Sequence, residues 1–194
     1  MKYPNSRLSM LIRSFCLPVV ILVFLAQAKA DKDLSLKLEI GRALDKGVTW
    51  LNGEQNASAG NWGEPEYPAL TGLALRATLG HPEPAVIGKF AKNQKAGFDF
   101  ILTKVQSDGG IYGKGLASYN TSICMMALLQ SKDAKFEEVI RKARKFLINQ
   151  QSDFDQKGKL DNTFDGGIGY GSRWAHSDLS NTHLAMEALF YAKR

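Results

Sequence analysis

The chain has 194 residues, of which 44% are hydrophobic and 23% are charged, and its formal net charge is +6. The length allows a single domain with a core of its own. Four of the basic residues and none of the acidic ones lie within residues 1–30, so the rest of the chain is nearly neutral. It has no basic cluster of the kind that marks a nucleic-acid-binding protein, and we expect no nucleic-acid partner.

The first thirty residues have the layout of a secretory signal peptide. Basic residues precede an apolar stretch from Phe15 to Ala26, and Ala28-Lys29-Ala30 is a small-x-small cleavage site. We therefore predict a signal peptide over 1–30 and an exported protein, periplasmic or secreted, over 31–194. An uncleaved N-terminal anchor is the alternative, although the apolar stretch is shorter than the roughly 20 residues that span a bilayer. Cleavage leaves Cys124 as the sole thiol, which excludes an internal disulfide.

The spacing of apolar residues predicts six helices separated by turns that contain Gly or Pro. Their expected ranges are 34–52, 69–79, 85–105, 121–130, 135–151 and about 179 to the end. The first, third and fifth are amphipathic and rich in charge, whereas the others are apolar and rich in small residues. No segment alternates with a period of two, so we expect no more than one or two short strand pairings. This alternation predicts helical hairpins with charged helices outside and apolar helices inside.

One pattern occurs three times along the chain. In each copy a Gln follows an amphipathic helix, a glycine-rich turn closes on an aromatic residue and Gly, and an apolar helix opens with Thr. The defining residues are Gln55, Gly63 and Thr71, then Gln106, Gly113 and Thr121, then Gln151, Gly171 and Thr182. A repeat of about fifty residues is typical of stacked supersecondary units.

The Gln, the turn and the aromatic–glycine pair resemble the repeats of the squalene cyclase and prenyltransferase superfamily, over about residues 44–191. The pairs are Trp62-Gly63, Tyr112-Gly113 and Tyr170-Gly171, so Tyr replaces Trp in two of them. The resemblance implies an all-α fold of stacked helical hairpins, the α/α toroid, of which three hairpins make half a ring. It also implies that each Gln stacks on an aromatic ring and bonds to backbone at a neighbouring helix end. We therefore expect 31–194 to be an incomplete toroid repeat domain.

The catalytic signatures of that superfamily do not occur in this sequence. The cyclases use an Asp-x-Asp-Asp motif, and the nearest run here is Asp153-Phe154-Asp155. Protein prenyltransferases bind zinc at the starts of inner helices, where this chain has Asn120 and Asn181. One further set has zinc chemistry but fits no ligand spacing: Cys124, His176, Asp178 and His183. We expect no metal and no cofactor, and whether the chain is an enzyme stays open.

The predicted ligand-binding residues are aromatic or polar residues near the turns and helix starts. They are Trp62, Tyr67, Tyr119, Trp174, Asp178 and His183, with Tyr191 as a further aromatic candidate. The aromatic residues could line an apolar pocket for an isoprenoid or pack between repeats. Several polar candidates could instead have purely structural roles. His183 would be a cap or core residue, and Cys124 a buried apolar residue. Asp108 and Asp165 would brace turns, and Thr121 and Thr182 would be caps or first-turn residues.

Three functions remain open. The first is an exported squalene-cyclase/prenyltransferase-like repeat protein that binds an apolar, isoprenoid-type ligand or a protein partner, with no chemistry of its own. The alternative is a fragment of an isoprenoid cyclase or prenyltransferase whose catalytic residues lie in the missing half. A third, by analogy of fold alone, is a polysaccharide-active enzyme that uses Glu64, Glu66, Asp165 and Asp178. Since the last helix lacks a polar cap, we also expect self-association through open repeat ends, and membrane contact only through the signal sequence.

Overall fold

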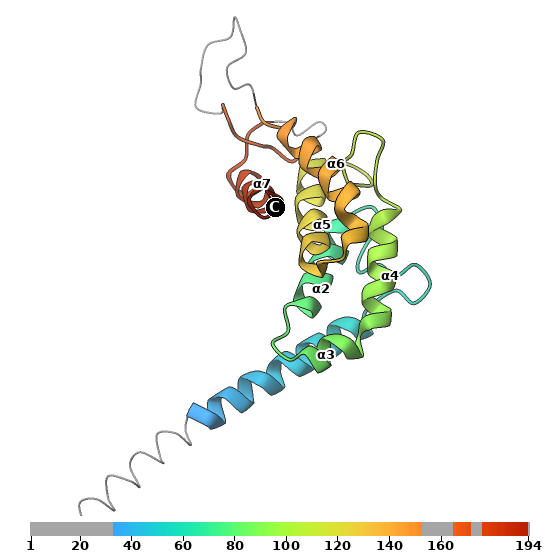
Figure 1. Cartoon of the computed structure of the whole chain (residues 1–194), viewed down its shortest axis with the longest axis vertical. Coiled ribbons are helices and arrows are strands. Elements are labelled where there is room, and N and C mark those ends of the chain that lie inside the picture. Colours follow the sequence, from blue (N-terminus) through green and yellow to red (C-terminus); the bar gives the residue numbers. More distant parts are fainter. Residues whose placement is uncertain (1–32, 153–164, 172–175, 194) are drawn as a thin grey trace, which may run out of the picture. The chain divides into compact units, whose positions relative to one another are not determined.

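The computed structural model describes residues 33–152, 165–171 and 176–193 (Figure 1). The chain divides into two compact units, Met1–Lys46 and Gly47–Arg194. The predicted signal peptide lies outside the described residues. The described part of the first unit is helical, within a helix over 33–53, and its leucines and Ile40 are exposed. None of the described helices is long and apolar enough to cross a membrane.

The second unit is built from helices. After the helix over 33–53 come α2 (Pro68–Leu79), α3 (Pro84–Lys89), α4 (Ala91–Leu102), α5 (Ala117–Ser131), the 3-10 turn η1 (Ala134–Phe136), α6 (Glu137–Ile148) and α7 (Leu179–Tyr191). The extended pairings in the described ranges are two isolated antiparallel bridges, Val105 with Ile111 and Gln151 with Ile168. The expectation of an all-α fold with a short pairing or two is confirmed for these residues.

Two of the expected helices are each divided. The helix expected over 85–105 breaks at Phe90, whose φ of −102° and ψ of 20° leave the helical region. The break lets the Phe90 ring enter the core, whereas α3 buries none of its residues. The helix expected from 135 begins as η1, where the Asp133 side chain accepts a hydrogen bond from the amide of Lys135 at 3.1 Å. The apolar spacing alone would predict one continuous helix in each place. Burial of Phe90 interrupts the first helix, and capping by Asp133 changes the start of the second.

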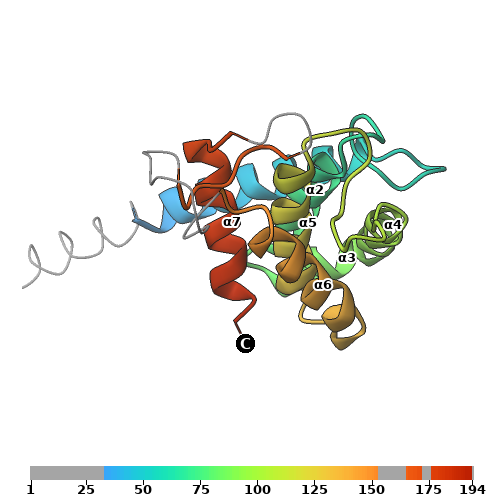
Figure 2. The ribbon, with the colours of Figure 1, turned by 90° about the horizontal axis from the view of Figure 1, so that it is seen from above.

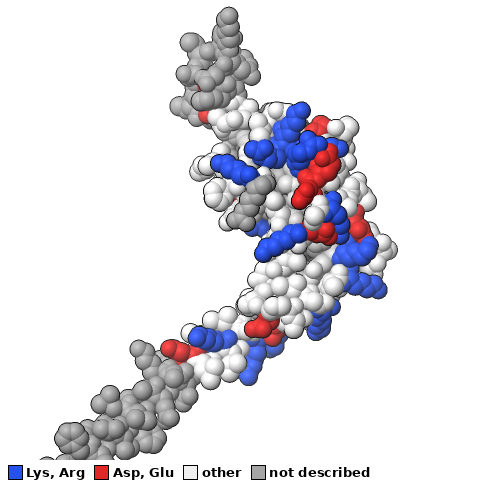
Figure 3. Space-filling model, in the orientation of Figure 1, with Lys and Arg blue, Asp and Glu red and all other residues white. Residues whose placement is uncertain are grey.

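The helices of the second unit form two layers. We name α2, α5 and α7 the apolar row, because α5 packs against α2 on one side and α7 on the other. We name α4 and α6 the charged layer; α4 packs on α2 and α6 packs on α5 (Figure 2). Lys and Arg alternate with Asp and Glu over the charged layer (Figure 3). The predicted alternation of charged and apolar helices is therefore observed in this unit.

The helix α5 lies at the centre of the core. Except for Tyr119, every residue from Ala117 to Leu128 is buried. In contrast, α6 buries one stripe, which includes Ala143, Phe146 and Leu147. Complete burial explains why α5 is apolar on nearly every side, and contact with one neighbouring layer explains the stripe on α6.

The three turns share a set of backbone hydrogen bonds. Each contains a glycine with positive φ, where a residue with a side chain would be strained: Gly60, Gly109 and Gly166, with φ of 77°, 90° and 80°. Its amide donates to a carbonyl earlier in the turn, at 2.8 to 3.2 Å, from Asn56, Gln106 and Ser152 respectively. In return, the amides of these three carbonyl-bearing residues donate to the carbonyl oxygen of the residue after the glycine, namely Asn61, Gly110 and Gly167. The turns thus repeat as one backbone motif, but in this motif Gln106 is equivalent to Asn56 and Ser152, so the predicted alignment of Gln106 with Gln55 and Gln151 is wrong by one residue.

A threonine of the apolar row joins each turn to its helix. The hydroxyl oxygens of Thr71, Thr121 and Thr182 accept hydrogen bonds at 3.1, 2.8 and 2.9 Å from the amides of Trp62, Ile111 and Ile168. Thr182 is the fourth residue of α7 and lies in its first turn, as one of the two predicted roles had it, whereas Thr121 is the fifth residue of α5 and is neither a cap nor a first-turn residue. These bonds make Trp62 equivalent to Ile111 and Ile168. The alignment of Trp62 with Tyr112 and Tyr170 is wrong by one and two residues.

The predicted structural glutamines and glycines have more local roles than expected. The side-chain amides of Gln55, Gln106 and Gln151 donate to carbonyls of the turns that follow them, at Gly60, Tyr112 and Gly166. Gln55 also donates to Asn93 in α4 at 2.9 Å. Gly63 and Gly171 have positive φ, but Gly113 does not. Gly113 is needed because a Cβ there would lie 2.6 Å from the carbonyl oxygen of Glu66.

Candidate ligand-binding site

Trp62 is a core residue. Its indole nitrogen donates to the carbonyl oxygen of Leu51 at 2.6 Å, and its side chain is buried. The ring packs so closely on α4 that a Cβ at Gly97 would lie 3.0 Å from it. This hydrogen bond satisfies the polar end of the indole, so Trp62 joins the turn to two helices.

Three other predicted site residues lie at the N-terminal ends of successive helices of the apolar row. Tyr67 directly precedes α2, Tyr119 lies in the first turn of α5, and Asp178 caps α7. The ring of Tyr119 lies 6.2 Å from that of Tyr170, centroid to centroid. Trp174 lies outside the described residues.

Asp178 has a capping role. Its Oδ1 accepts hydrogen bonds from the amide of Asn181 at 2.8 Å and from the hydroxyl of Ser180 at 2.7 Å. These bonds favour the carboxylate and hold the pKa of Asp178 below its usual value. His183, one turn further, is exposed, so its expected role as a cap or core residue is wrong.

Two cavities lie at the opposite, C-terminal end of the apolar row. The first, of about 510 Å³, is lined by Arg76 of α2, by Met126, Leu129 and Gln130 of α5, by Lys132, and by Glu187 and Tyr191 of α7. An ion pair crosses α5 here, with Arg76 Nη2 3.2 Å from Glu187 Oε1. The Gln130 side chain donates to the carbonyl oxygen of Arg76 at 3.2 Å. At this end the side chains of α2 and α7 therefore meet across α5.

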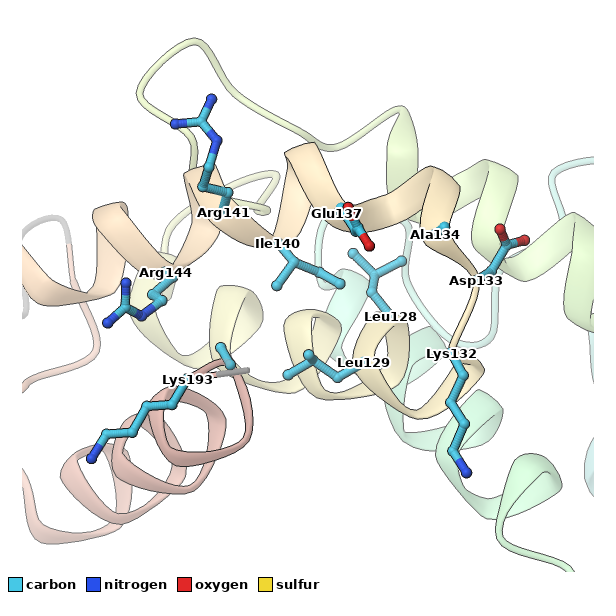
Figure 4. A pocket seen from close by; sticks show the side chains of 11 residues that line it. Leu128, Leu129, Lys132, Asp133, Ala134, Glu137, Ile140, Arg141, Arg144 and Lys193 are labelled. Carbon is cyan, nitrogen blue, oxygen red and sulfur yellow. The ribbon is translucent and has the colours of Figure 1, made fainter.

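The second cavity, of about 550 Å³, lies between α5, α6 and the end of α7. Leu128, Leu129 and Ile140 face its interior from α5 and α6 (Figure 4). Arg144 and Lys193 stand at its edge. Among the described residues, neither of these two cations is in an ion pair, so both are available to an anionic group.

Lys132 connects the two cavities. Both are lined by Lys132 and Leu129, and we name them together the C-terminal cleft. Lys132 follows the last residue of α5 with φ of 56° and ψ of 21°, the left-handed conformation that usually belongs to Gly. Lys132 therefore lines both cavities from a position at which the backbone of a residue with a side chain is strained.

The predicted chemical groups are not brought together in the cleft. Cys124 is fully buried in α5, and burial raises the pKa of its thiol well above the usual value. No group of three His, Cys, Asp or Glu side chains that could hold a metal ion occurs within the described ranges. Asp108 braces its turn as predicted, since its Oδ1 accepts from the amide of Gly110 at 2.8 Å. Burial and the Asp108 carboxylate, which accepts from the Tyr112 hydroxyl, raise the pKa of Tyr112 to about 12.

Sequence reasoning missed most of the cleft. Tyr191 was an aromatic candidate, but Arg76, Lys132 and Glu187 were not. A signal existed for two of them, because Arg76 and Glu187 are the only charged residues in α2 and α7. Searches of family models, of curated proteins and of solved structures found nothing that matches this chain.

Proposed function

We propose that the protein is an exported repeat protein of the squalene cyclase and prenyltransferase type. It binds an apolar, isoprenoid-type molecule in the C-terminal cleft and catalyses no reaction there. The threefold turn motif and the packing of the charged layer on the apolar row support an arc of helical hairpins, as in part of an α/α toroid. Residues 1–30 supply the export signal in this proposal.

The two adjoining cavities carry the proposal. Their volumes, about 510 and 550 Å³, fall in the range of small-molecule sites. Met126, Leu128, Leu129 and Ile140 give them apolar walls, and such walls bind hydrocarbon by removing it from water. A prenyl chain can lie along these walls while Lys132, Arg144 and Lys193 attract an anionic end.

The acidic groups of the cleft favour binding over catalysis. Glu187 is paired with Arg76, and Asp133 lies 2.8 Å from Lys135 in a second ion pair. The hydrogen bonds from Lys135 hold the pKa of Asp133 below its usual value, so near neutral pH Asp133 is ionised and a poor proton acceptor. The third acid that lines the cleft, Glu137, is exposed.

Equilibrium dialysis of the purified chain against farnesol and farnesyl phosphate tests the proposal. We expect saturable binding of both probes, with farnesyl phosphate tighter at low salt because of the cations. Leu129→Glu places a carboxylate on the wall that both cavities share and should weaken binding about ten-fold or more. Leu102→Glu, at an exposed leucine of α4, is the matched control and should bind normally.

Two results would contradict the proposal. Absence of saturation with either probe in a folded protein would exclude the apolar ligand. Recovery of a converted probe, cyclised or transferred, would exclude the non-catalytic part and favour the cyclase or transferase alternative.

A further inference from the structure

The contacts between successive helices of the apolar row repeat at equivalent positions. Since Thr71, Thr121 and Thr182 make the same hydrogen bond, residues at the same offset from them are equivalent. At the α2–α5 contact, a Cβ on Gly72 would lie 3.0 Å from the Ile123 side chain. Gly72 therefore faces the next helix, and Ile123 faces the preceding one.

The side of each helix that faces the next one forms a stripe at offsets −3, +1, +4 and +8 from its threonine. In α2 and α5 the stripe is buried or half-buried: Pro68, Gly72, Leu75 and Leu79, then Ser118, Ser122, Met125 and Leu129. In α7 the same stripe is Leu179, His183, Met186 and Phe190. All four of these side chains are exposed, with Leu179 at 87%, Met186 at 63% and Phe190 at 65%. We name these four residues the end face.

The side that faces the preceding helix shows the opposite pattern. In α5 it is Asn120, Ile123 and Ala127, which are buried. The equivalents in α2 are Leu70, Leu73 and Ala77, which are exposed. Leu70 and Leu73 border a groove of about 460 Å³ that is also lined by Trp50 and Trp62.

The same comparison can be made between the helix over 33–53 and α4 of the charged layer. The equivalence of Asn56 and Gln106 in the turns makes Trp50 equivalent to Phe100 and Gly47 equivalent to Gly97. Phe100 is buried, whereas Trp50 is 66% exposed. A Cβ at Gly97 would lie 3.1 Å from Leu75, but one at Gly47 would meet nothing within 4 Å. We name Gly47, Trp50, Leu70, Leu73 and Ala77 the start face; it belongs to the same compact unit as the end face.

We propose that the end face of one copy docks on the start face of a second copy, head to tail. The internal contacts are the template for this interface. Leu75 packs on Gly97 within the chain, so the equivalent Met186 of one copy packs on Gly47 of the other. Among the described residues both halves of this interface are exposed, and a second copy supplies an apolar partner for each of them. The contact is heterologous, so it closes into a ring or continues along a row of copies.

Sedimentation velocity of the full chain over a range of concentrations tests this proposal. Wild type should form dimers or larger species. Met186→Glu in the end face and Leu73→Glu in the start face should each raise the apparent dissociation constant at least about ten-fold, since a charge is then buried at an apolar contact. Lys145→Glu, at an exposed position of α6, should assemble like wild type. Circular dichroism melting checks that the variants fold, which their exposed positions favour.

A mixture of Met186→Glu and Leu73→Glu distinguishes head-to-tail pairing from other ways in which two copies could associate. Met186→Glu keeps an intact start face, and Leu73→Glu keeps an intact end face. The mixture should therefore form one-to-one heterodimers that grow no further. Folded variants that fail to pair while wild type assembles would overturn the proposal, and so would a wild-type chain that stays monomeric at every concentration.

Discussion

At the scale of single residues, three threonines hold the repeat together. Each hydroxyl oxygen accepts a hydrogen bond from the amide of a turn residue. In the second repeat both partners, Thr121 and Ile111, are fully buried. A buried amide without an acceptor loses its hydrogen bond to water and gains nothing in return. The sequence shows the threonines, but their acceptor role depends on the turn folding back onto the helix.

Thr121→Val tests this role. Valine keeps the shape and leaves the Ile111 amide unsatisfied, so unfolding should become easier by about 1–3 kcal/mol in urea denaturation. Thr121→Ser keeps the hydroxyl and should lose less. Equal stability of Thr121→Val and wild type would show that this hydrogen bond makes no net contribution to the free energy of unfolding.

The turn glycines permit a second test with a control from the same chain. Gly109 has φ of 90°, and a Cβ there would lie 2.8 Å from the carbonyl oxygen of Lys142. Gly115 has φ of 76°, but a Cβ there would meet nothing within 4 Å. Gly115→Ala should cost about 1 kcal/mol for backbone conformation alone. Gly109→Ala should cost clearly more in thermal denaturation, and a smaller loss than at Gly115 would refute the close approach of turn and α6.

A substitution of Lys132 should change ligand binding and the stability of the fold in opposite directions. Lys132→Gly relieves the left-handed backbone and should stabilise the fold by roughly 1 kcal/mol. The same change removes a cation shared by both cavities, so the affinity for farnesyl phosphate should fall while that for farnesol changes little. Thermal melting and dialysis together measure both effects. Parallel loss of stability and binding, or no change in either, would contradict a binding role for the side chain.

At the scale of elements, the number and character of the helices were largely predictable, because apolar period and turn residues are local signals. The break at Phe90 was not, since it depends on where the ring is buried. The register of the repeats was also missed. Trp62, Tyr112 and Tyr170 look alike in sequence, but the hydrogen bonds to threonine define equivalence through backbone atoms.

The contact between α2 and α5 gives an element-scale prediction. At Gly72 a Cβ would already lie 3.4 Å from the Cα of Cys124, so a larger residue must push the two helices apart. Gly72→Leu should destabilise the protein by about 1–3 kcal/mol through overpacking. His183→Leu, at the equivalent exposed position of α7, should be nearly neutral in the monomer. Similar losses at both positions, measured by urea denaturation, would contradict the assigned equivalence.

At the scale of the whole molecule, the second unit shares one hydrophobic core, which runs from Trp62 to Ala188. Repeat arrays usually link nearest neighbours only, yet Arg76 and Glu187 join the first and third helices of the apolar row. Both side chains are partly exposed, so this ion pair adds little stability. Its consequence is the shape of the C-terminal cleft. The sequence singles out Arg76 and Glu187 as the only charged residues of their helices, but it does not show that they pair, because they are 111 positions apart.

Amide hydrogen exchange by NMR tests the threefold repeat most directly. We expect the amides of Trp62, Ile111 and Ile168 to exchange slowly. We also expect Thr71→Val, Thr121→Val and Thr182→Val each to accelerate exchange at their own partner amide far more than at the other two. Fast exchange of all three amides in the wild-type protein, or a threonine variant that leaves its partner amide protected, would contradict the threefold repeat.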